Sequence, residues 1–185
     1  MKDHELFYQR LLQEAQKRAV DRFNRHLKSP DERKVWRGLT IGTITDEAID
    51  IADNEWHEYY EDEGWCGFSI SWQRLSYKFE PIPSHFSTAV WQEIGDEKIL
   101  QGMAYGKFNK SKSALYVNFV ERSFAPTYFK GGILLPILAC AEEYALLVEA
   151  KEVRINEPLD ASIYERYGYK APDGDKRAKY LAKEL

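Results

Sequence analysis

The residues with the clearest chemical potential form a short loop, Lys130-Gly131-Gly132-Ile133, directly before a long apolar segment. Glycine has no Cβ, so backbone N–H groups beside it can approach a bound oxygen atom closely. The start of a helix carries partial positive charge, and Lys130 adds a full charge next to it. Together these features are typical of a phosphate-binding site. The same residues also fit a strand-to-helix turn that binds no ligand.

Other common catalytic patterns are absent from the sequence. The four histidines, at His4, His26, His57 and His85, show no metal-ligand spacing with one another. The two cysteines, Cys66 and Cys140, lie far apart and form no CxxC motif, which is typical of a reducing compartment. No Ser/His/Asp or Cys/His arrangement can be singled out. We therefore expect no metal site and no activated serine or cysteine.

Size and composition restrict the class of protein further. The chain has 185 residues, of which 44% are hydrophobic and 30% charged, with only 7 prolines and 11 glycines. These values exclude collagen-like, low-complexity and largely disordered chains. The 26 Lys and Arg against 30 Asp and Glu leave a net charge of −4, which disfavours a uniformly basic nucleic-acid binder.

Neither an export signal nor a membrane span is predicted. The first residues, Met1 to Glu5, are charged and lead into a charged segment. The most hydrophobic stretch, Ile133 to Val148, is interrupted by Glu142 and Glu143 and is shorter than the roughly 20 residues that cross a bilayer. We expect a soluble, cytoplasmic protein.

A strongly amphipathic helix is predicted from Glu5 to Leu27, because its apolar residues recur at spacings of three and four until Ser29-Pro30 ends the pattern. We treat residues 1–30 as an N-terminal element and residues 31–185 as the main domain. The apolar stripe must be buried somewhere, so the helix is also a candidate for oligomerisation or partner docking. Basic residues concentrated between Arg10 and Arg37 leave nucleic acid open as a partner.

The middle of the chain predicts two further helices. Thr45 fits an N-cap for a helix that runs to about Tyr60, and a short helix is expected from Ser69 to Lys78. The stretch from Asp46 to Glu63 holds nine acidic residues and no Lys or Arg. Its plainest interpretation is a solvated face that lies opposite the basic Arg10 to Arg37 segment.

The second half alternates between strand and helix patterns. Gly95-Asp96 predicts a hairpin turn, and the apolar run Ala114 to Val120 predicts a central strand. The expected strands are His85 to Glu93, Lys98 to Lys107, Ala114 to Ser123, Lys151 to Asn156 and Lys179 to Leu185, and the expected helices are Ile133 to Glu149 and Asp160 to Tyr167. The order β-β-β-α-β-α-β predicts a mixed α/β fold whose helices pack on a central sheet.

This order, with particular residues in it, resembles the GNAT acetyltransferase superfamily. Tyr164-Glu165-Arg166-Tyr167-Gly168-Tyr169 is similar to the family's Y-E-K-L-G-F motif at the end of its fourth helix. Val153-Arg154-Ile155-Asn156 is similar to its fifth strand. The resemblance covers Phe86 to Leu185, and Trp36 to Tyr60 resembles its first strand and helix. It implies a GNAT-like mixed central sheet flanked by helices, here with an additional N-terminal amphipathic helix.

The resemblance implies transfer of an acyl group from a CoA thioester, with acetyl-CoA as cosubstrate, to an amine. An ammonium group has a pKa near ~10.4, so a base must remove its proton before attack. Glu121 is the candidate base, unless it only pairs with Arg122 or a neighbouring strand. Tyr164 is the candidate acid for the departing thiolate, unless it is only a core aromatic.

The donor would be held by residues of the glycine loop and of the fifth strand. The resemblance assigns this role to the backbone around Phe124, to Lys130-Gly131-Gly132-Ile133 and to Asn156, which either bonds pantetheine amides or caps the turn before Pro158. The family's loop reads [QR]-x-x-G-x-[GA]. Here Ile133 or Leu134 replaces the small residue, and Tyr128 or Phe129 replaces the Gln or Arg.

Two functions from different classes follow. The first is an acyl-CoA-dependent N-acyltransferase, whose amine acceptor the nine carboxylates of the Asp46 to Glu63 segment would attract. The second is a non-catalytic, GNAT-shaped module that binds a protein or nucleic-acid partner, motivated by the irregular glycine loop and the basic N-terminal helix. The acceptor and the oligomeric state stay open, and a homo-oligomer is one option.

Overall fold

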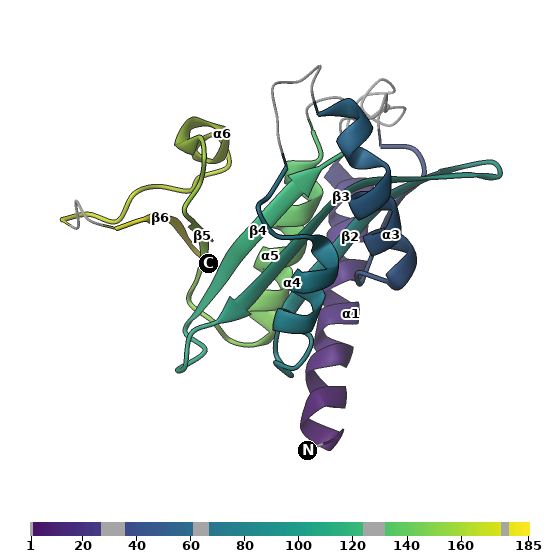
Figure 1. Cartoon of the computed structure of the whole chain (residues 1–185). Helices are drawn as coiled ribbons and strands as arrows, with labels where there is room; N and C mark the ends of the chain where they lie inside the picture. The colour runs from purple at the N-terminus through teal and green to yellow at the C-terminus, as the bar shows by residue number, and fades with distance from the viewer. Residues whose placement is uncertain (1, 27–35, 61–66, 124–131, 175–177) are drawn as a thin grey trace.

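A computed structural model describes residues 2–26, 36–60, 67–123, 132–174 and 178–185. Its centre is one six-stranded sheet in the order β1-β2-β3-β4-β5-β6, in which only the β4–β5 pair is parallel. The strands are β1 (Leu39–Gly42), β2 (Phe86–Ile94), β3 (Glu97–Phe108), β4 (Ala114–Arg122), β5 (Glu152–Asn156) and β6 (Tyr180–Glu184). The five predicted strands are confirmed to within one residue at each end, and Figure 1 shows them side by side in the sheet.

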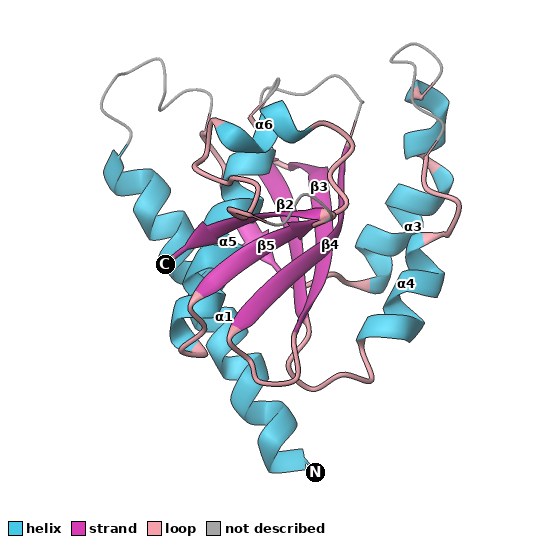
Figure 2. Ribbon diagram, turned by 90° about the vertical axis from the view of Figure 1, so that its left-hand side faces the viewer, coloured by secondary structure: helices cyan, strands magenta, loops and turns pink. Residues whose placement is uncertain are grey.

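Helices cover both faces of this sheet, so the predicted mixed α/β fold is confirmed. Figure 2 shows α1 and α5 on one side of the sheet and α3 and α4 on the other. The helical elements are α1 (Lys2–His26), α3 (Asp46–Asn54), the 3-10 turn η1 (Trp56–Tyr59), α4 (Trp72–Phe79), α5 (Leu134–Leu147) and α6 (Ala161–Glu165). Within the described residues, no helix has the length and apolarity needed to cross a bilayer.

The N-terminal helix α1 packs into the hydrophobic core. Its apolar stripe, which includes Leu12, Ala15, Ala19 and Phe23, is buried and belongs to the same hydrophobic cluster as most of α5. The apolar stripe of α1 is therefore buried within the chain itself, in the same cluster as α5. Only near the N-terminal end do large apolar side chains of α1 stay exposed, Leu6 among them.

The segment predicted as one helix from Thr45 to Tyr60 is divided in two. Thr45 caps the helix as predicted, since its hydroxyl accepts a hydrogen bond of 3.3 Å from the backbone N–H of Ala48. After Asn54, however, the backbone tightens into η1, where i→i+3 bonds replace the α-helical ladder. This change of winding accompanies the burial of Trp56, which is only 2% exposed.

The helix α3 in turn positions α4. One carboxylate oxygen of Asp53 accepts the backbone N–H of Trp72 at 2.8 Å, and the other accepts that of Gln73 at 3.0 Å. Ser71 adds a capping bond to the N–H of Arg74. Because these acceptors satisfy free N–H groups of the first turn, α4 starts at Trp72, later than the predicted Ser69.

The acidic segment does not face the basic one in the described part of the chain. Since α3 and α1 cover opposite faces of the sheet, their charged side chains are separated by it (Figure 2). Glu47 of α3 instead pairs with Lys98 of β3 at 2.9 Å. The interpretation of Asp46 to Glu63 as a face opposite Arg10 to Arg37 is therefore wrong for these residues.

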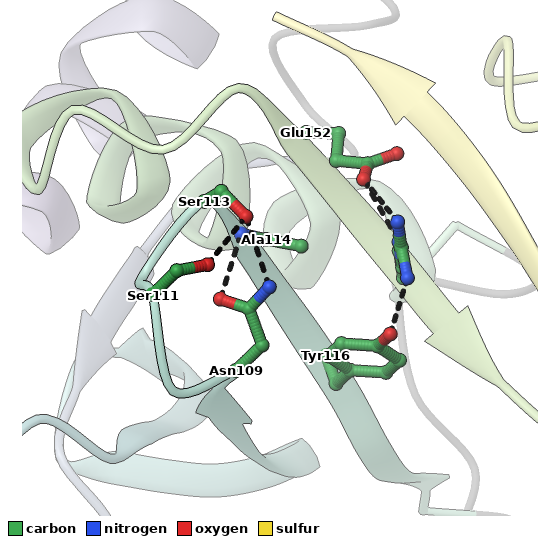
Figure 3. Close-up of polar contacts among 7 residues, drawn as sticks. Asn109, Ser111, Ser113, Ala114, Tyr116 and Glu152 are labelled. Atoms are coloured by element: carbon green, nitrogen blue, oxygen red, sulfur yellow. Dashed lines mark hydrogen bonds and ion pairs between the residues drawn. The ribbon is translucent and has the colours of Figure 1, made fainter.

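Side chains fasten β4 to β5 at the end of the sheet where β4 begins. Asn109 orders the preceding turn through Ser113 and through the backbone N–H of Ala114, at 2.9 and 3.3 Å (Figure 3). Arg154 of β5 bonds Tyr116 of β4 and donates from Nε to Glu152 at 2.9 Å. Of these contacts, the one between Arg154 and Tyr116 joins the two strands of the parallel pair.

A buried carboxylate joins three elements on the α5 face. Glu142 of α5 accepts hydrogen bonds from Tyr169 at 3.2 Å, Lys183 at 2.7 Å and Arg22 at 3.3 Å. Burial and the neighbouring Glu142 charge raise the pKa of the Tyr169 phenol. The network therefore links α1, α5 and β6 around the negative charge of Glu142, which Arg22 and Lys183 compensate.

Candidate functional site

Strands β4 and β5 are paired only along the first half of β4 and diverge after Val117 and Ile155. We call the opening between the two diverging strands the fork. Paired residues run from Ala114 opposite Glu152 to Val117 opposite Ile155, whereas β4 continues to Arg122 with β3 alone as its partner. At the fork, Asn118 is an extra residue relative to β3, because Gly106 pairs with Val117 and Tyr105 with Phe119. Such a bulge bends a strand locally, which accounts for the divergence of β4 from β5.

A cavity of about 280 Å³ occupies this fork. Strand β4 supplies Asn118, Val120 and Glu121 to its walls, and β5 supplies Ile155 and Asn156. The remaining walls come from the first turn of α5, from α6 and the loop before it, and from Phe68. Most of this lining is apolar and a few polar groups converge on it, which is the usual composition of a small-molecule site.

Glu121 is an acidic residue of this cavity whose side chain is fixed by hydrogen bonds. Its side chain is buried, with the residue 5% exposed. Oε1 accepts a hydrogen bond of 2.8 Å from the Tyr60 hydroxyl, and Oε2 accepts one of 2.6 Å from the Trp72 indole nitrogen. Burial and the Glu121 charge raise the pKa of Tyr60, so its hydroxyl stays protonated and continues to donate. Both bonds hold the side chain of a residue that lines a largely apolar cavity.

Tyr164 approaches the same cavity from α6. It is partly buried against the large core cluster and also lines the cavity, so it is a core aromatic that the cavity can still reach. Desolvation by burial raises its pKa above the ordinary tyrosine value, and the phenol is protonated at neutral pH. The helix is capped by Asp160, whose carboxylate accepts the backbone N–H of Ser162 at 2.9 Å.

The predicted donor-binding residues are only partly within the described structure. Asn156 is the last residue of β5 and lines the cavity. Ile133 immediately precedes α5 and lines it too, and the carbonyl of Gly132 accepts the N–H of Leu135 at 3.1 Å. Phe124 and Lys130-Gly131 lie outside the described residues.

Three residues of the site escaped the sequence reasoning. Tyr60 and Trp72 lie 61 and 49 positions from the carboxylate that they bond. No spacing rule connects residues so far apart. Asn118 carried a usable signal, because it is a polar interruption of the apolar run from Ala114 to Val120.

Comparisons with solved structures identify the fold. An aminoglycoside 6'-acetyltransferase type Ii matches with a TM-score of 0.54 and 15% identity over 78% of this chain and 96% of that one. A putative N-acetyltransferase from Lactobacillus plantarum matches with a TM-score of 0.52 and 17% identity over 80% and 99%. A putative acetyltransferase from Salmonella typhimurium, solved with its cofactor acetyl-CoA, gives 0.52 and 12% over 80% and 95%.

These likenesses are of fold, since the identities are low. No protein-family model matches the chain, and no curated protein sequence matches it. The six-stranded sheet with one parallel pair, flanked by helices, is the GNAT acetyltransferase fold, as the sequence motifs predicted.

Proposed function

We propose that this chain is an acyl-CoA-dependent N-acyltransferase, with the activity in residues 31–185. The observation that carries the proposal is one cavity at the β4–β5 fork that brings Glu121, Tyr164 and Asn156 together from three different elements. Similarity of fold to a structure solved with acetyl-CoA supports a thioester donor. Similarity to an aminoglycoside acetyltransferase supports an amine acceptor.

In the proposed reaction, Glu121 acts as general base. Its carboxylate takes a proton from the acceptor ammonium, directly or through one water, and the neutral amine attacks the thioester carbonyl. A C–N bond forms as the carbonyl oxygen takes up negative charge. Backbone N–H groups near Phe124 are the proposed donors to this oxyanion, and loss of one such donor typically costs on the order of 10²-fold in rate.

Collapse of the tetrahedral intermediate breaks the C–S bond and releases the CoA thiolate. Tyr164 is the proposed general acid, because it lines the cavity and its phenol is protonated at neutral pH. The proton count balances because the nitrogen loses two protons in all, one to Glu121 before attack and one to the Tyr164 phenolate or to water as the intermediate collapses, while sulfur gains one from Tyr164. Glu121 then passes its proton to bulk water, so one proton is released overall.

The donor's phosphates are proposed to lie at the start of α5, near Lys130-Gly131-Gly132 and Ile133. A helix of 14 residues presents free N–H groups and partial positive charge at that end. The pantetheine arm would then follow the fork toward Glu121 and Tyr164, with Asn156 bonding one of its amides.

Calorimetric titration of acetyl-CoA into the full chain tests the proposal. We expect saturable binding at sub-millimolar concentration, followed by release of free thiol when a suitable primary amine is added from a panel of polyamines, aminoglycosides and peptides. Absence of binding in that range would remove the basis of the proposal. Binding without thiol release across the panel would favour the non-catalytic binding module.

A further inference from the structure

The edge of the sheet is open where β2 begins. Strand β1 ends with Gly42 opposite Ala89, whereas β2 already starts at Phe86. The chain leaves the sheet after Gly42 and turns into α3. In the part of the chain that the structure describes, no strand therefore lies beside Phe86 to Thr88 on the β1 side of β2.

A cavity of about 290 Å³ adjoins this open stretch of β2, and Ser87 lines it. Its other walls come from several elements: α1 supplies Tyr8, the end of α4 and the connection to β2 supply Glu80 and His85, and β3 supplies Tyr105. The cavity and the fork cavity have no lining residue in common. It is therefore a separate space, walled in part by the N-terminal helix.

The charge of this cavity is negative. Glu80 is the only Asp, Glu, Lys or Arg residue in the described lining, and its carboxylate has no ion-pair partner among the described residues. The negative field extends to the buried wall, since burial and then the charges of Glu80 and Asp46 raise the pKa of Tyr105. Such a field attracts a cation.

The polar groups of the wall include acceptors for N–H donors. Nδ1 of His85 lies 2.7 Å from the carbonyl oxygen of Ile82, so Nδ1 carries a proton and Nε2 of the neutral ring is an acceptor. The Glu80 carboxylate accepts only, and the hydroxyl of Tyr105 also has acceptor capacity. No group of three or more His, Cys, Asp or Glu that could hold a metal ion occurs among the described residues. These groups therefore suit an ammonium ion better than a metal ion.

One wall of the cavity already contacts an ammonium group of the chain itself. Lys112 does not line the cavity, but its Nζ lies 4.1 Å from the centroid of the Tyr8 ring and donates to the Tyr8 hydroxyl. Aromatic rings attract ammonium groups through the negative charge of their faces. The chemistry expected of a ligand is thus present at this wall.

We propose that this cavity binds a small primary ammonium ion, with its charge beside Glu80 and its N–H groups donating to Glu80, His85 and Tyr105. The volume lies near the lower end of the usual range for ligand sites, roughly 300–1,000 Å³, and so favours a short alkylamine. The inference goes beyond the proposed function and does not rest on it, because the proposed acyl transfer takes place at the fork.

The test is a titration of the full chain with propylammonium, without CoA and at constant ionic strength, followed on the His85 ring signals by NMR. Two further probes are 1-propanol, which lacks the charge, and tetramethylammonium, which lacks N–H donors. We expect saturable binding of propylammonium with a Kd on the order of 1 mM, and binding of each other probe at least about 10-fold weaker.

Three variants locate the bound amine. Glu80→Gln should weaken propylammonium binding about 10-fold. Glu97→Gln, which removes the same charge from an exposed residue outside the lining, should leave it unchanged. Glu121→Gln, in the fork, should also leave it unchanged, and thermal unfolding confirms that each variant is folded.

Several results would overturn the inference. They are equal binding of propylammonium and either other probe, unchanged binding by Glu80→Gln, and an equal loss in Glu80→Gln and Glu97→Gln. Loss of binding in Glu121→Gln would assign the amine to the fork and would overturn it too. Since no titration includes CoA, each of these failures leaves the proposed function standing, and a failure of CoA to bind leaves this inference standing.

Discussion

The indole nitrogen of Trp72 lies 2.6 Å from a carboxylate oxygen of Glu121, so a helix on one face of the sheet holds an acidic side chain of the central strand β4. Asp53 caps α4 at Trp72, and α4 then presents the indole to Glu121. Tyr60 adds the second bond after the chain has tightened into η1. The acidic helix α3 thus contributes to the site by fixing α4.

Replacing Trp72 by Phe should lower turnover while the fold persists. Phe keeps most of the buried ring but removes the N–H donor, so the Glu121 carboxylate loses a hydrogen bond that orients it. We expect kcat/KM to fall about 10-fold, with CoA affinity within 2-fold of the wild type. The measurement is steady-state thiol release together with calorimetry.

Trp56→Phe is the control for this change, because Trp56 is equally buried in the same cluster. If Trp56→Phe lowered kcat/KM as much as Trp72→Phe, loss of packing would explain the result and the positioning role would be wrong.

Replacing Tyr164 by Phe should separate chemistry from donor binding. The phenol is the proposed acid for the thiolate, so kcat should fall by on the order of 10²-fold while CoA affinity stays nearly constant. Tyr167→Phe, one turn further and on the wall of a different cavity, should retain activity. Equal turnover of Tyr164→Phe and the wild type would exclude Tyr164 as the acid.

The N-terminal helix should contribute to the stability of the whole domain. Leu12 is 4% exposed in the core cluster, so Leu12→Ala should lower the free energy of unfolding by about 2–4 kcal/mol. Leu6→Ala, at a side chain that is 49% exposed on the same helix, should change it by less than about 0.5 kcal/mol. Chemical denaturation measures both. Similar small effects for the two variants would contradict the packing of α1 on α5.

Alkaline pH should destabilise the protein through its buried tyrosines. Burial raises the pKa of Tyr105 and of Tyr169 above the ordinary value of about 10, so the folded state keeps these protons at pH values where the unfolded chain loses them. The stabilisation is therefore complete below pH 10 and is lost as pH rises above it. The free energy of unfolding should fall on the order of 1.4 kcal/mol per pH unit for each group.

Unfolding curves between pH 8 and about 11.5 check this slope, with tyrosinate absorbance as the second signal. Tyr169→Phe should make the decline shallower, whereas Tyr77→Phe, at a side chain that is 70% exposed, should not. A stability that stayed constant across the range would contradict the burial of these phenols.

The second half of the fold was predictable because each local signal agreed with the final packing. The hairpin at Gly95 and the apolar run of β4 both correspond to observed strands. Thr45 capped its helix as its side chain predicts. The helical segment between β4 and β5 implied a parallel pair, because parallel neighbours need a crossover connection.

The parts that depend on distant contacts were not predictable. Nothing in the sequence near Tyr60 shows that its hydroxyl meets a carboxylate 61 positions away. The division of the Thr45 to Tyr60 segment follows from the burial of Trp56, which is a tertiary effect. The bulge at Asn118 changes the register of β4 against β3, and register is set by the neighbouring strand.

A crystal structure of the full chain with CoA tests the central claim most directly. The account predicts density for the pantetheine arm between β4 and β5, with one of its amides beside Asn156 and its sulfur within roughly 4 Å of the Tyr164 hydroxyl. Density for CoA elsewhere on the surface, or a fork filled by the protein's own side chains with CoA present in excess, would contradict it.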